Sequence, residues 1–310
     1  MKLIRLAPSA PALKHGTALA LGMFDAVHCG HRQILLAAKQ QSTARAIACA
    51  VLCFSASPHG APALLPEEER LAQFAALGVD YAAVFDFAEL KDLPPQAFFD
   101  DIVCDTLHAR AVFAGYNYRF GAEARGDAAL LQSLAAARGV DCFITPPVMP
   151  DGAPVSATRI RAALAAGEIE KANRLLGYPY YVRGRVLHGK ALGRTLGFPT
   201  VNLALPPHGA PLAGGIYYTT VSVDGKTYPA VSNVGVRPTV ETGGVCNLET
   251  HLLDFSGDLY GREVTVTFYG RGRGEVQFES TDALKAAVEK DIALARAFFR
   301  REGKRICENA

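Results

Sequence analysis

The sequence predicts an α/β protein in two parts, an N-terminal doubly wound parallel sheet and a C-terminal small antiparallel β-barrel with a terminal helix. Three observations support this fold class. The first half alternates continuous apolar runs of strand length with segments of helical periodicity. The second half carries short strand candidates, several with period two, separated by Gly, Pro and Asp. One long amphipathic stretch, Thr281 to Arg300, follows them and is expected to pack against the barrel.

The first half repeats a strand followed by a helix. Thr17 to Leu21 is small or apolar and is expected to form a buried strand, and the apolar positions Ile34, Leu35 and Ala38 indicate a helix after it. Such alternation implies a parallel sheet with right-handed crossovers, whose ligands bind beyond the carboxyl ends of the strands. The elements expected next are a strand over Ala46 to Phe54, a helix over Glu67 to Leu77, a strand over Tyr81 to Phe87, a helix over Pro95 to Leu107 and a strand over Ala111 to Ala114.

The second domain is expected to begin at Gly177. Glu168 to Leu176 has helical character and ends at this glycine, and Pro179 follows, so we place one domain at residues 1–176 and the other at residues 177–310. Strand candidates then follow one another at short intervals, which is typical of a small antiparallel barrel. They cover Tyr181 to Leu187, Ile216 to Val223, Thr227 to Val234, Leu248 to Phe255 and Glu263 to Phe268.

Composition limits the class of protein. With 310 residues, half of them hydrophobic, the chain can bury a sizeable core. No apolar run approaches the roughly 20 residues of a membrane helix and the N-terminus lacks the apolar core of a signal peptide, so we expect a cytoplasmic protein without a membrane partner. A net charge of +2 with interspersed signs predicts no nucleic-acid partner. The seven cysteines are scattered without a Cys-x-x-Cys pair, which favours reduced thiols; they are Cys29, Cys49, Cys53, Cys104, Cys142, Cys246 and Cys307.

The stretch from Leu19 to Leu36 holds the first candidate site. Its two histidines, His28 and His31, are expected in the loop between strand and helix or in the first turn of the helix, where unpaired amides and the helix dipole favour an anion such as a phosphate chain. Taken alone, a His-x-x-His pair is more often a polar loop or half of a metal site. The run from Gly22 to His31 resembles the signature of the His-x-Gly-His nucleotidylyltransferases, in the form found in bacterial FAD synthetases.

This resemblance implies that the histidines bind ATP phosphates and stabilise charge that develops during adenylyl transfer, which needs positioning and electrostatics rather than a covalent nucleophile. Ala26 stands where the family usually has Gly, and alanine is tolerated there only if the position does not require a positive φ. His59 belongs to a weaker match, because Gly60 follows it where the family tends to have proline, and its role stays open. Further nucleotide contacts implied by the resemblance are Gly22, Phe24, Asp25 and Gly30.

Two later segments fit the same family. Gly115 to Gly121 combines glycines, aromatic rings, an amide and a guanidinium, and such a turn either buries its aromatics or stacks on a flat heterocycle. It resembles the second motif of FAD synthetases, which implies that Asn117 lies near the bound nucleotide or flavin. Val155 to Arg161 opens a helix with hydroxyls and arginines, and forms either a solvated surface helix or a second anion site. It is similar to the family's Ser-Ser-Thr-x-Ile-Arg motif, which implies phosphate contacts from Ser156, Thr158 and Arg161.

Gly189 to Asn202, GKALGRTLGFPTVN, is the candidate site of the second half. Glycines let a backbone approach phosphates, and Thr200 with Asn202 offers hard oxygen ligands for Mg²⁺, although a plain glycine-rich loop is the commoner interpretation of such a run. The stretch resembles the riboflavin kinase signature Gly-Arg-x-Leu-Gly-Phe-Pro-Thr-x-Asn, whose Pro-Thr-x-Asn segment binds Mg²⁺ and nucleotide phosphates. The residues that this resemblance assigns to ligand binding are Gly189, Lys190, Arg194, Gly197, Pro199, Thr200 and Asn202.

Further kinase segments follow in order. Ser232 to Thr239 and Leu248 to Phe255 resemble them, and the resemblance implies that Glu249 is the general base that takes the proton of the riboflavin 5′-hydroxyl. A lone Glu in a strand is otherwise most often an exposed surface residue. Gly272 to Phe278 resembles the family's Leu-Arg-x-Glu-x-x-Phe segment beside the flavin, with Arg273 among the ligand-binding residues and extra glycines that favour a mobile flap.

The resemblance spans about Thr17 to Arg296 and implies a bifunctional riboflavin kinase and FMN adenylyltransferase. Its substrates would be riboflavin, FMN and ATP, with Mg²⁺ accompanying ATP. The N-terminal domain would be the nucleotidylyltransferase and the barrel would be riboflavin kinase-like. Two alternatives stay open. One is a kinase whose N-terminal domain is impaired, since Ala26, Gly60 and Ala157 all depart from the family pattern there. The other is a flavin-binding regulator without turnover, against which the joint presence of Glu249, Thr200 and Asn202 argues.

Overall fold

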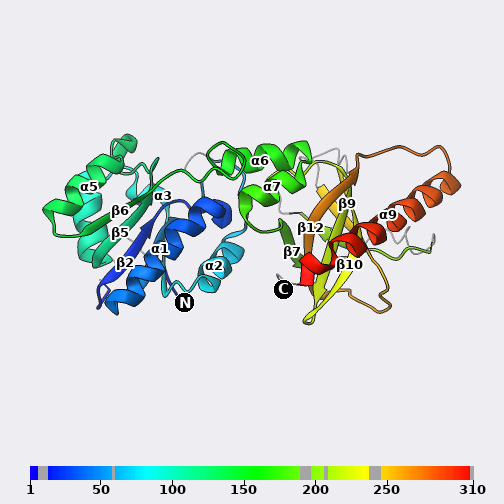
Figure 1. Ribbon diagram of the computed structural model, residues 1–310, viewed down its shortest axis with the longest axis horizontal. Coiled ribbons are helices and arrows are strands. Elements are labelled where there is room, and N and C mark those ends of the chain that lie inside the picture. Colours follow the sequence, from blue (N-terminus) through cyan, green and yellow to red (C-terminus); the bar gives the residue numbers. More distant parts are fainter. Residues whose placement is uncertain (6–12, 58–59, 189–196, 206–208, 237–245, 308–310) are drawn as a thin grey trace. The chain divides into compact units, whose positions relative to one another are not determined.

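The structure is a computed structural model, and Figure 1 shows its helices and strands. The residues that it describes are 1–5, 13–57, 60–188, 197–205, 209–236 and 246–307. The chain divides into two compact units, Met1–Thr158 and Arg159–Ala310, and the division falls within helix α6 (Ala157–Ala166). The expected domain boundary after residue 176 stays a prediction.

The first unit is built on a sheet whose six described strands all run parallel to their neighbours. The strand order is β1-β4-β3-β2-β5-β6, so β2 is central, with β3 and β4 on one side and β5 and β6 on the other. This reversal of winding direction at β2 is the switch point beside which ligands of such sheets bind. The strands are β1 (Lys2–Arg5), β2 (Thr17–Leu21), β3 (Ala48–Phe54), β4 (Tyr81–Phe85), β5 (Ala109–Gly115) and β6 (Asp141–Thr145).

Both faces of this sheet are apolar, and each has its own core. Leu19 and Leu21 of β2 belong to one buried cluster, which includes side chains of the π-helix Phe98–Thr106. Ala18 and Ala20 belong to a second cluster, which includes side chains of α1 and α2. The doubly wound arrangement predicted from the sequence is confirmed. The helices are α1 (Cys29–Arg45), α2 (Glu67–Ala76), α3 (Phe87–Leu90), α4 (Pro95–Ala97), which continues as the π-helix, and α5 (Ala128–Ala137), with 3₁₀ turns at Asp25–Val27 and Ala122–Ala124.

The second unit contains an antiparallel sheet that nearly closes into a barrel. Its described strands follow the order β7-β12-β9-β10-β11-β8. The two end strands approach each other where the N–H of Leu187 donates to the carbonyl oxygen of Asn202 at 2.8 Å. The predicted small antiparallel barrel is thus confirmed. Its strands are β7 (Tyr181–Arg185), β8 (Val201–Ala204), β9 (Gly215–Val223), β10 (Lys226–Val236), β11 (Cys246–Leu252) and β12 (Glu263–Arg273), and its further helices are α7 (Ile169–Leu176) and α9 (Thr281–Cys307).

Helix α9 packs on the outer face of the barrel, as expected from its amphipathic sequence. Ala295 and Ile292 of the helix belong to one apolar cluster with Val231 of β10 and with Ile216 and Tyr218 of β9. In Figure 1 the helix, drawn in orange to red, crosses these two strands. This packing fixes α9 against strands that carry candidate site residues.

Three strands were not expected from the sequence. Strands β1 and β8 have four residues each, too few to show a clear period. Strand β6, DCFIT, has neither a continuous apolar run nor strict alternation. The sequence predicted no strand in the segment that contains Asn202, whereas the structure places this residue in β8. Within the described ranges, no helix has the length and apolar composition required to span a bilayer.

Candidate active sites

In the first unit, the loops after β2, β3 and β5 lie at one edge of the sheet because these strands are parallel neighbours. The loop after β2 runs directly into α1. His28 is the N-cap residue of this helix, and its Nδ1 accepts the backbone N–H of His31 at 3.3 Å. The two histidines therefore lie in the loop and in the first turn of the helix, as expected.

The imidazole rings of His28 and His31 stack on each other. Their centroids are 3.6 Å apart and their planes differ by 13°. Since Nδ1 of His28 accepts a hydrogen bond, the ring proton of its neutral form is assigned to Nε2, which is then a donor. Nδ1 of His31 is buried and has no hydrogen-bond partner among the described residues. An unsatisfied buried nitrogen at a helix N-terminus is a group that a ligand can satisfy.

Burial keeps both histidines neutral near pH 7. It lowers the pKa of His28 from 6.5 to about 4, and a backbone hydrogen bond opposes this only in part. The pKa of His31 is lowered well below 6.5, first by burial and then by the nearby His28 and Arg70, and a hydrogen bond to the backbone of Asp25 opposes this only in part. The loop would therefore recognise an anion through N–H dipoles and neighbouring cations rather than through imidazolium charge.

Ala26 adopts a backbone conformation that disfavours alanine. Its φ is 66° and its ψ is −9°, and Phe24 and Val27 also have positive φ values of 51° and 47°. Alanine was expected to be tolerated at this position only if φ need not be positive. The structure does not meet this condition. The loop keeps a left-handed residue here, and a non-glycine residue bears a cost of about 1–2 kcal/mol in that region.

Three of the residues assigned to nucleotide binding shape the loop itself. Phe24 is fully buried, and Asp25 is buried with its Oδ1 accepting the N–H of Leu64 at 3.0 Å. The N–H of Gly22 donates to the carbonyl oxygen of Leu52 at 3.3 Å, which ties the loop to the end of β3. These contacts give the three residues a structural role, and their contact with a nucleotide stays a prediction.

Gly30 lies where another predicted segment approaches the histidine loop. A Cβ added at Gly30 would lie 3.0 Å from Cγ1 of Val155 and 3.3 Å from Cε1 of His28, so a side chain would displace its neighbours. Ser156 directly precedes α6 and Thr158 lies in its first turn. The structure thus brings the start of the Ser-x-Thr segment beside the histidine loop.

Arg161 lies one turn further along α6, within the second unit. Its predicted contact with the phosphates stays a prediction.

Asn117 lies at the carboxyl edge of the sheet next to α1. Its Oδ1 is 3.3 Å from the point that a Cβ on Gly115 would occupy, and Cδ1 of Ile34 is 3.6 Å from the same point. In the same turn Phe120 is buried, whereas Tyr116 is 45% exposed. The turn therefore buries one of its aromatic rings, and stacking of another on a flat heterocycle stays a prediction.

Sequence analysis missed Arg70, a buried cation beside the histidine loop. This residue of α2 is only 4% exposed. Its Nη1 donates to the carbonyl oxygen of Met23 at 3.3 Å and its Nη2 to that of Phe54 at 2.6 Å, while its Nε is buried without a partner among the described residues. The available signal was a basic residue on the buried side of a helix, four positions before Phe74.

In the second unit, strand register brings predicted residues together on the outside of the barrel. Glu249 of β11 pairs with Asn202 of β8 on one side and with Asn233 of β10 on the other. Residues directly opposite in antiparallel strands have Cβ atoms about 4.5–5.5 Å apart. Their neighbours Leu203 and Leu248 are buried, so the three polar residues occupy the other, outward face. We call Asn202, Glu249 and Asn233 the outer row.

Asn202 carries an unsatisfied ligand atom. Its Oδ1 is buried and has no hydrogen-bond partner among the described residues. A cation can satisfy such an oxygen, and the Thr200 hydroxyl adds a second neutral oxygen of the class that Mg²⁺ prefers. In the described part of the chain, no three His, Cys, Asp or Glu side chains form a metal site on their own. The oxygens of Asn202 and Thr200 fit a divalent cation that takes its other ligands from elsewhere.

The segment that leads into β8 is held against β11. Nδ1 of His251 lies 2.9 Å from the carbonyl oxygen of Pro199, and its ring meets that of Phe198 edge-on. This contact fixes the backbone next to Thr200, and Gly197 begins the described part of the segment. Four residues of the sequence predictions lie outside the described ranges: His59, Gly189, Lys190 and Arg194.

Arg273, which was expected beside the ligand, is held by a residue of α9. Its Nε and Nη2 donate to Oδ1 and Oδ2 of Asp291 at 3.1 and 2.7 Å. Its Nη1 donates to the carbonyl oxygen of Gly274 at 3.1 Å. Sequence analysis did not single out Asp291, because an acidic residue on a long amphipathic helix is usually solvated. The ion pair with Asp291 thus anchors the segment Gly272 to Phe278 at Arg273, its second residue.

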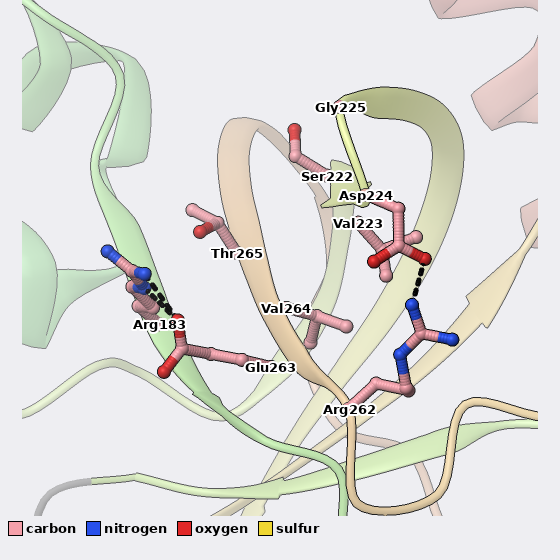
Figure 2. Close-up of a pocket in the computed structure, with 9 residues that line it drawn as sticks. All are labelled: Arg183, Ser222, Val223, Asp224, Gly225, Arg262, Glu263, Val264 and Thr265. Atoms are coloured by element: carbon pink, nitrogen blue, oxygen red, sulfur yellow. Dashed lines mark hydrogen bonds and ion pairs between the residues drawn. The ribbon is translucent and has the colours of Figure 1, made fainter.

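A cavity of about 370 Å³ lies elsewhere on the barrel, between the turn that joins β9 to β10 and the start of β12 (Figure 2). Two ion pairs line it, Arg262 with Asp224 and Arg183 with Glu263. It contains none of the predicted site residues. Because a carboxylate faces each arginine, the cavity offers no excess positive charge for a phosphate.

The strain at Ala26 can be measured by substitution. In Ala26→Gly, relief of about 1–2 kcal/mol of strain offsets about 0.8 kcal/mol of lost burial and about 0.4–1 kcal/mol of chain entropy, so the free energy of unfolding should change little. Ala38→Gly is the matched control, because Ala38 is equally buried but lies within α1. We expect the control to lose about 2 kcal/mol in denaturant titrations. Equal losses in the two variants would contradict the strain.

The lowered pKa of His28 predicts a loss of stability in acid. The unfolded chain takes up a proton as pH falls through 6.5, whereas the folded chain does so only near 4, so this contribution is present above pH 6.5 and is lost between pH 6.5 and 4. At pH 5 the loss should be about 2 kcal/mol. His28→Asn keeps an N-cap side chain but does not titrate. We expect the free energy of unfolding to change less between pH 7 and pH 5 in this variant than in the parent. An equal change in both would refute the lowered pKa of His28 as the cause.

Comparisons with known proteins agree with the order of the motifs. A family model of FAD synthetase matches residues 10–159, and a riboflavin kinase model matches residues 176–299. A bifunctional riboflavin kinase/FMN adenylyltransferase from Pseudomonas fluorescens is 38% identical over 304 residues, which cover 96% of this chain and 97% of the relative. The protein of the same description from Escherichia coli K12 is 37% identical over 308 residues, which cover 96% and 98% of the two chains.

A solved structure also matches over nearly the whole length. It is described as a macrolide-efflux protein from Streptococcus pneumoniae, and it is similar with a TM-score of 0.88 and 30% identity over 95% of this chain and 98% of that chain. This likeness shows a shared fold across both units. Two family models in the expected order and relatives matched from end to end lead to one conclusion: the chain belongs to the family of bifunctional riboflavin kinase/FMN adenylyltransferases.

Proposed function

We propose that the barrel transfers the γ-phosphoryl group of ATP to riboflavin, and that the first unit transfers the adenylyl group of ATP to the FMN so formed. Membership of the family supports both activities. The observation that carries the kinase half is the outer row, in which register sets Glu249 opposite Asn202, whose amide oxygen has no partner among the described residues. A proton acceptor and a cation ligand are thereby side by side.

In the kinase reaction, Glu249 accepts the proton of the riboflavin 5′-hydroxyl while that oxygen attacks the γ-phosphorus and ADP leaves. Asn202 and Thr200 would hold a divalent cation, for which we propose Mg²⁺. When bound, the cation neutralises charge on the ATP phosphates. Both ligands are neutral oxygens, so the cation should bind mainly together with ATP.

In the adenylyl transfer, a phosphate oxygen of FMN attacks the α-phosphorus of ATP and pyrophosphate leaves. The chain needs to supply orientation and hydrogen-bond donors rather than a nucleophile. The Nε2–H of His28, the ring of His31 and the first amides of α1 would contact the phosphates, and Arg70 adds a positive charge close by. Further contacts that we propose come from Asn117, Ser156, Thr158 and Arg161.

Glu249→Gln should lower FMN formation by about 100-fold to 10,000-fold, because glutamine keeps the shape of the side chain but accepts no proton. FAD formation from supplied FMN should stay at the parent rate. Chromatographic separation of FMN and FAD after incubation with riboflavin, ATP and Mg²⁺ measures both. Glu263→Gln is the matched control, since Glu263 is an exposed glutamate of the same barrel outside the outer row. Kinase turnover close to the parent in Glu249→Gln would exclude this residue as the base.

His31→Ala should have the converse effect. Loss of one group that stabilises charge in the transition state typically lowers the rate by about 100-fold to 1,000-fold, so FAD formation from FMN should fall by this factor. Riboflavin phosphorylation should be unchanged. His15→Ala serves as control, because His15 is exposed and lies before the amino end of β2, away from the candidate site. A parent-like rate of FAD formation in His31→Ala would contradict the role given to the histidine pair.

The unaltered protein discriminates the alternatives in the same assay. Formation of FMN without FAD would identify a kinase whose first unit is impaired, and the departures at Ala26, Gly60 and Ala157 would then be the first positions to restore. Binding of riboflavin without either product would identify a flavin-binding regulator. Formation of both products supports the proposed function.

A further inference from the structure

We propose that Asp291 is a positioning residue for the riboflavin kinase reaction, which holds Arg273 in the orientation in which this arginine binds the flavin substrate. The inference rests on the proposed function of the barrel. It adds to that function a residue of the terminal helix α9, which no sequence motif identified.

The contact between the two side chains is a bidentate ion pair. Nε and Nη2 of Arg273 each donate to a different carboxylate oxygen of Asp291, at 3.1 and 2.7 Å. The Asp291 side chain is 7% exposed and the Arg273 side chain is 28% exposed. A fork of this kind fixes the plane of the guanidinium as well as its place, which a single contact would not do.

The pair leaves part of the arginine available to a ligand. A guanidinium has five N–H donors. Two of those of Arg273 serve Asp291, and a third, on Nη1, serves the carbonyl oxygen of Gly274 at 3.1 Å. The ring of Phe278 lies beneath, with its centroid 5.6 Å from Cζ of Arg273. The arginine is thus held on one edge and one face, and the donors of its other edge are not used by these contacts.

Strand register connects Arg273 with the outer row. It pairs with Ile216 of β9, Ile216 pairs with Asn233 of β10, and Asn233 pairs with Glu249 of β11. Three strand spacings separate Arg273 from Glu249, about 14 Å in all. The arginine therefore lies at one end of a line of outward-facing residues and the proposed base lies toward the other end.

The chain that follows Arg273 also lies beside this line. Oε1 of Glu275 is 3.2 Å from the point that a Cβ on Gly235 would occupy, and Nδ2 of Asn233 is 3.8 Å from the same point. Gly235 is two residues beyond Asn233 on the same face of β10. An anchor at Arg273 consequently places the segment Arg273–Phe278 next to the outer row. The acceptor that holds this anchor is the carboxylate of Asp291, which is fixed in turn by the packing of α9 on the barrel.

A second ion pair made by the same helix provides a control, because it ties α9 to the barrel without contacting Arg273. Nη1 and Nη2 of Arg296 donate to the two carboxylate oxygens of Asp254, both at 2.7 Å. This pair also ties α9 to the barrel by a bidentate contact, but Asp254 follows β11 and is exposed. Asparagine tolerates the left-handed backbone of residue 254, whose φ is 59°, so Asp254→Asn removes the charge without backbone strain.

The test compares riboflavin kinetics of the full-length protein in five forms: the parent, Asp291→Asn, Arg273→Gln, the double variant and Asp254→Asn. We expect Asp291→Asn to raise the KM for riboflavin about ten-fold with kcat changed less than about two-fold, since the ion pair orients a binding group and not the reacting atoms. Asp254→Asn should keep the parent KM. The double variant should be no worse than Arg273→Gln, because Asp291 acts through Arg273.

The outcomes separate failure of this inference from failure of the proposed function. A parent that forms no FMN overturns the proposed function itself. With an active parent, an Asp291→Asn KM equal to that of Asp254→Asn overturns the inference, as does an additive effect in the double variant. The kcat at saturating riboflavin reports whether the barrel of each variant is folded, and if Asp291→Asn fails this check, an unchanged riboflavin KM in Arg273→Gln overturns the inference on its own.

Discussion

The candidate kinase site depends on strand register in the barrel, and buried hydroxyl groups secure the part of it that sets Asn233 of β10 opposite Glu249 of β11. The hydroxyls of Thr219 and Ser232 are 2.7 Å apart, and those of Ser232 and Thr250 are 2.8 Å apart. All three side chains are buried inside the barrel, where an unpaired hydroxyl is costly. A slip by one residue would break this chain and would also turn Glu249 from the outer face into the core. Interior polar pairing and exterior chemistry therefore constrain the same alignment of β10 with β11.

In the first unit, the corresponding constraint is the removal of the histidine pair from water. Burial deprives His28 and His31 of charge, so the loop cannot attract an anion by protonation near pH 7. Instead it offers oriented donors at a helix N-terminus, together with the guanidinium of Arg70. Such groups are already oriented before the substrate arrives, which is the condition for stabilising charge in a transition state without reorganisation.

Sequence patterns predicted the architecture because its main elements carry strong periods. The apolar runs at Thr17–Leu21 and Ala48–Phe54 can be buried on both faces only in a parallel sheet covered by helices on both sides. The same patterns missed β8, because four residues after a glycine-rich run show no period, and this strand carries Asn202. The conformation of Ala26 was equally inaccessible, since φ is set by the packing of the whole loop.

Residues that act through tertiary contacts were the other omission. A sequence presents Arg70 and Asp291 as ordinary members of helices, and only the fold shows that each is buried beside a candidate site. Motifs identify residues whose type and spacing are diagnostic. They do not identify a partner that comes from another element, such as the acid of α9 that holds Arg273 at the end of β12.

The two buried arginine contacts differ in a way that matches the substrates proposed for each unit. Arg70 is held by the neutral carbonyl oxygens of Met23 and Phe54, so its positive charge is not cancelled by these partners. Arg273 is held by the carboxylate of Asp291, so the pair is neutral overall. An uncancelled buried cation favours a polyanion such as the ATP phosphates, because attraction between charges is strong where water is excluded. The neutral pair of Arg273 and Asp291 offers oriented donors without a strong positive field, so it suits the uncharged riboflavin better than a phosphate chain. This difference would help to keep riboflavin and the ATP phosphates in separate parts of the barrel site.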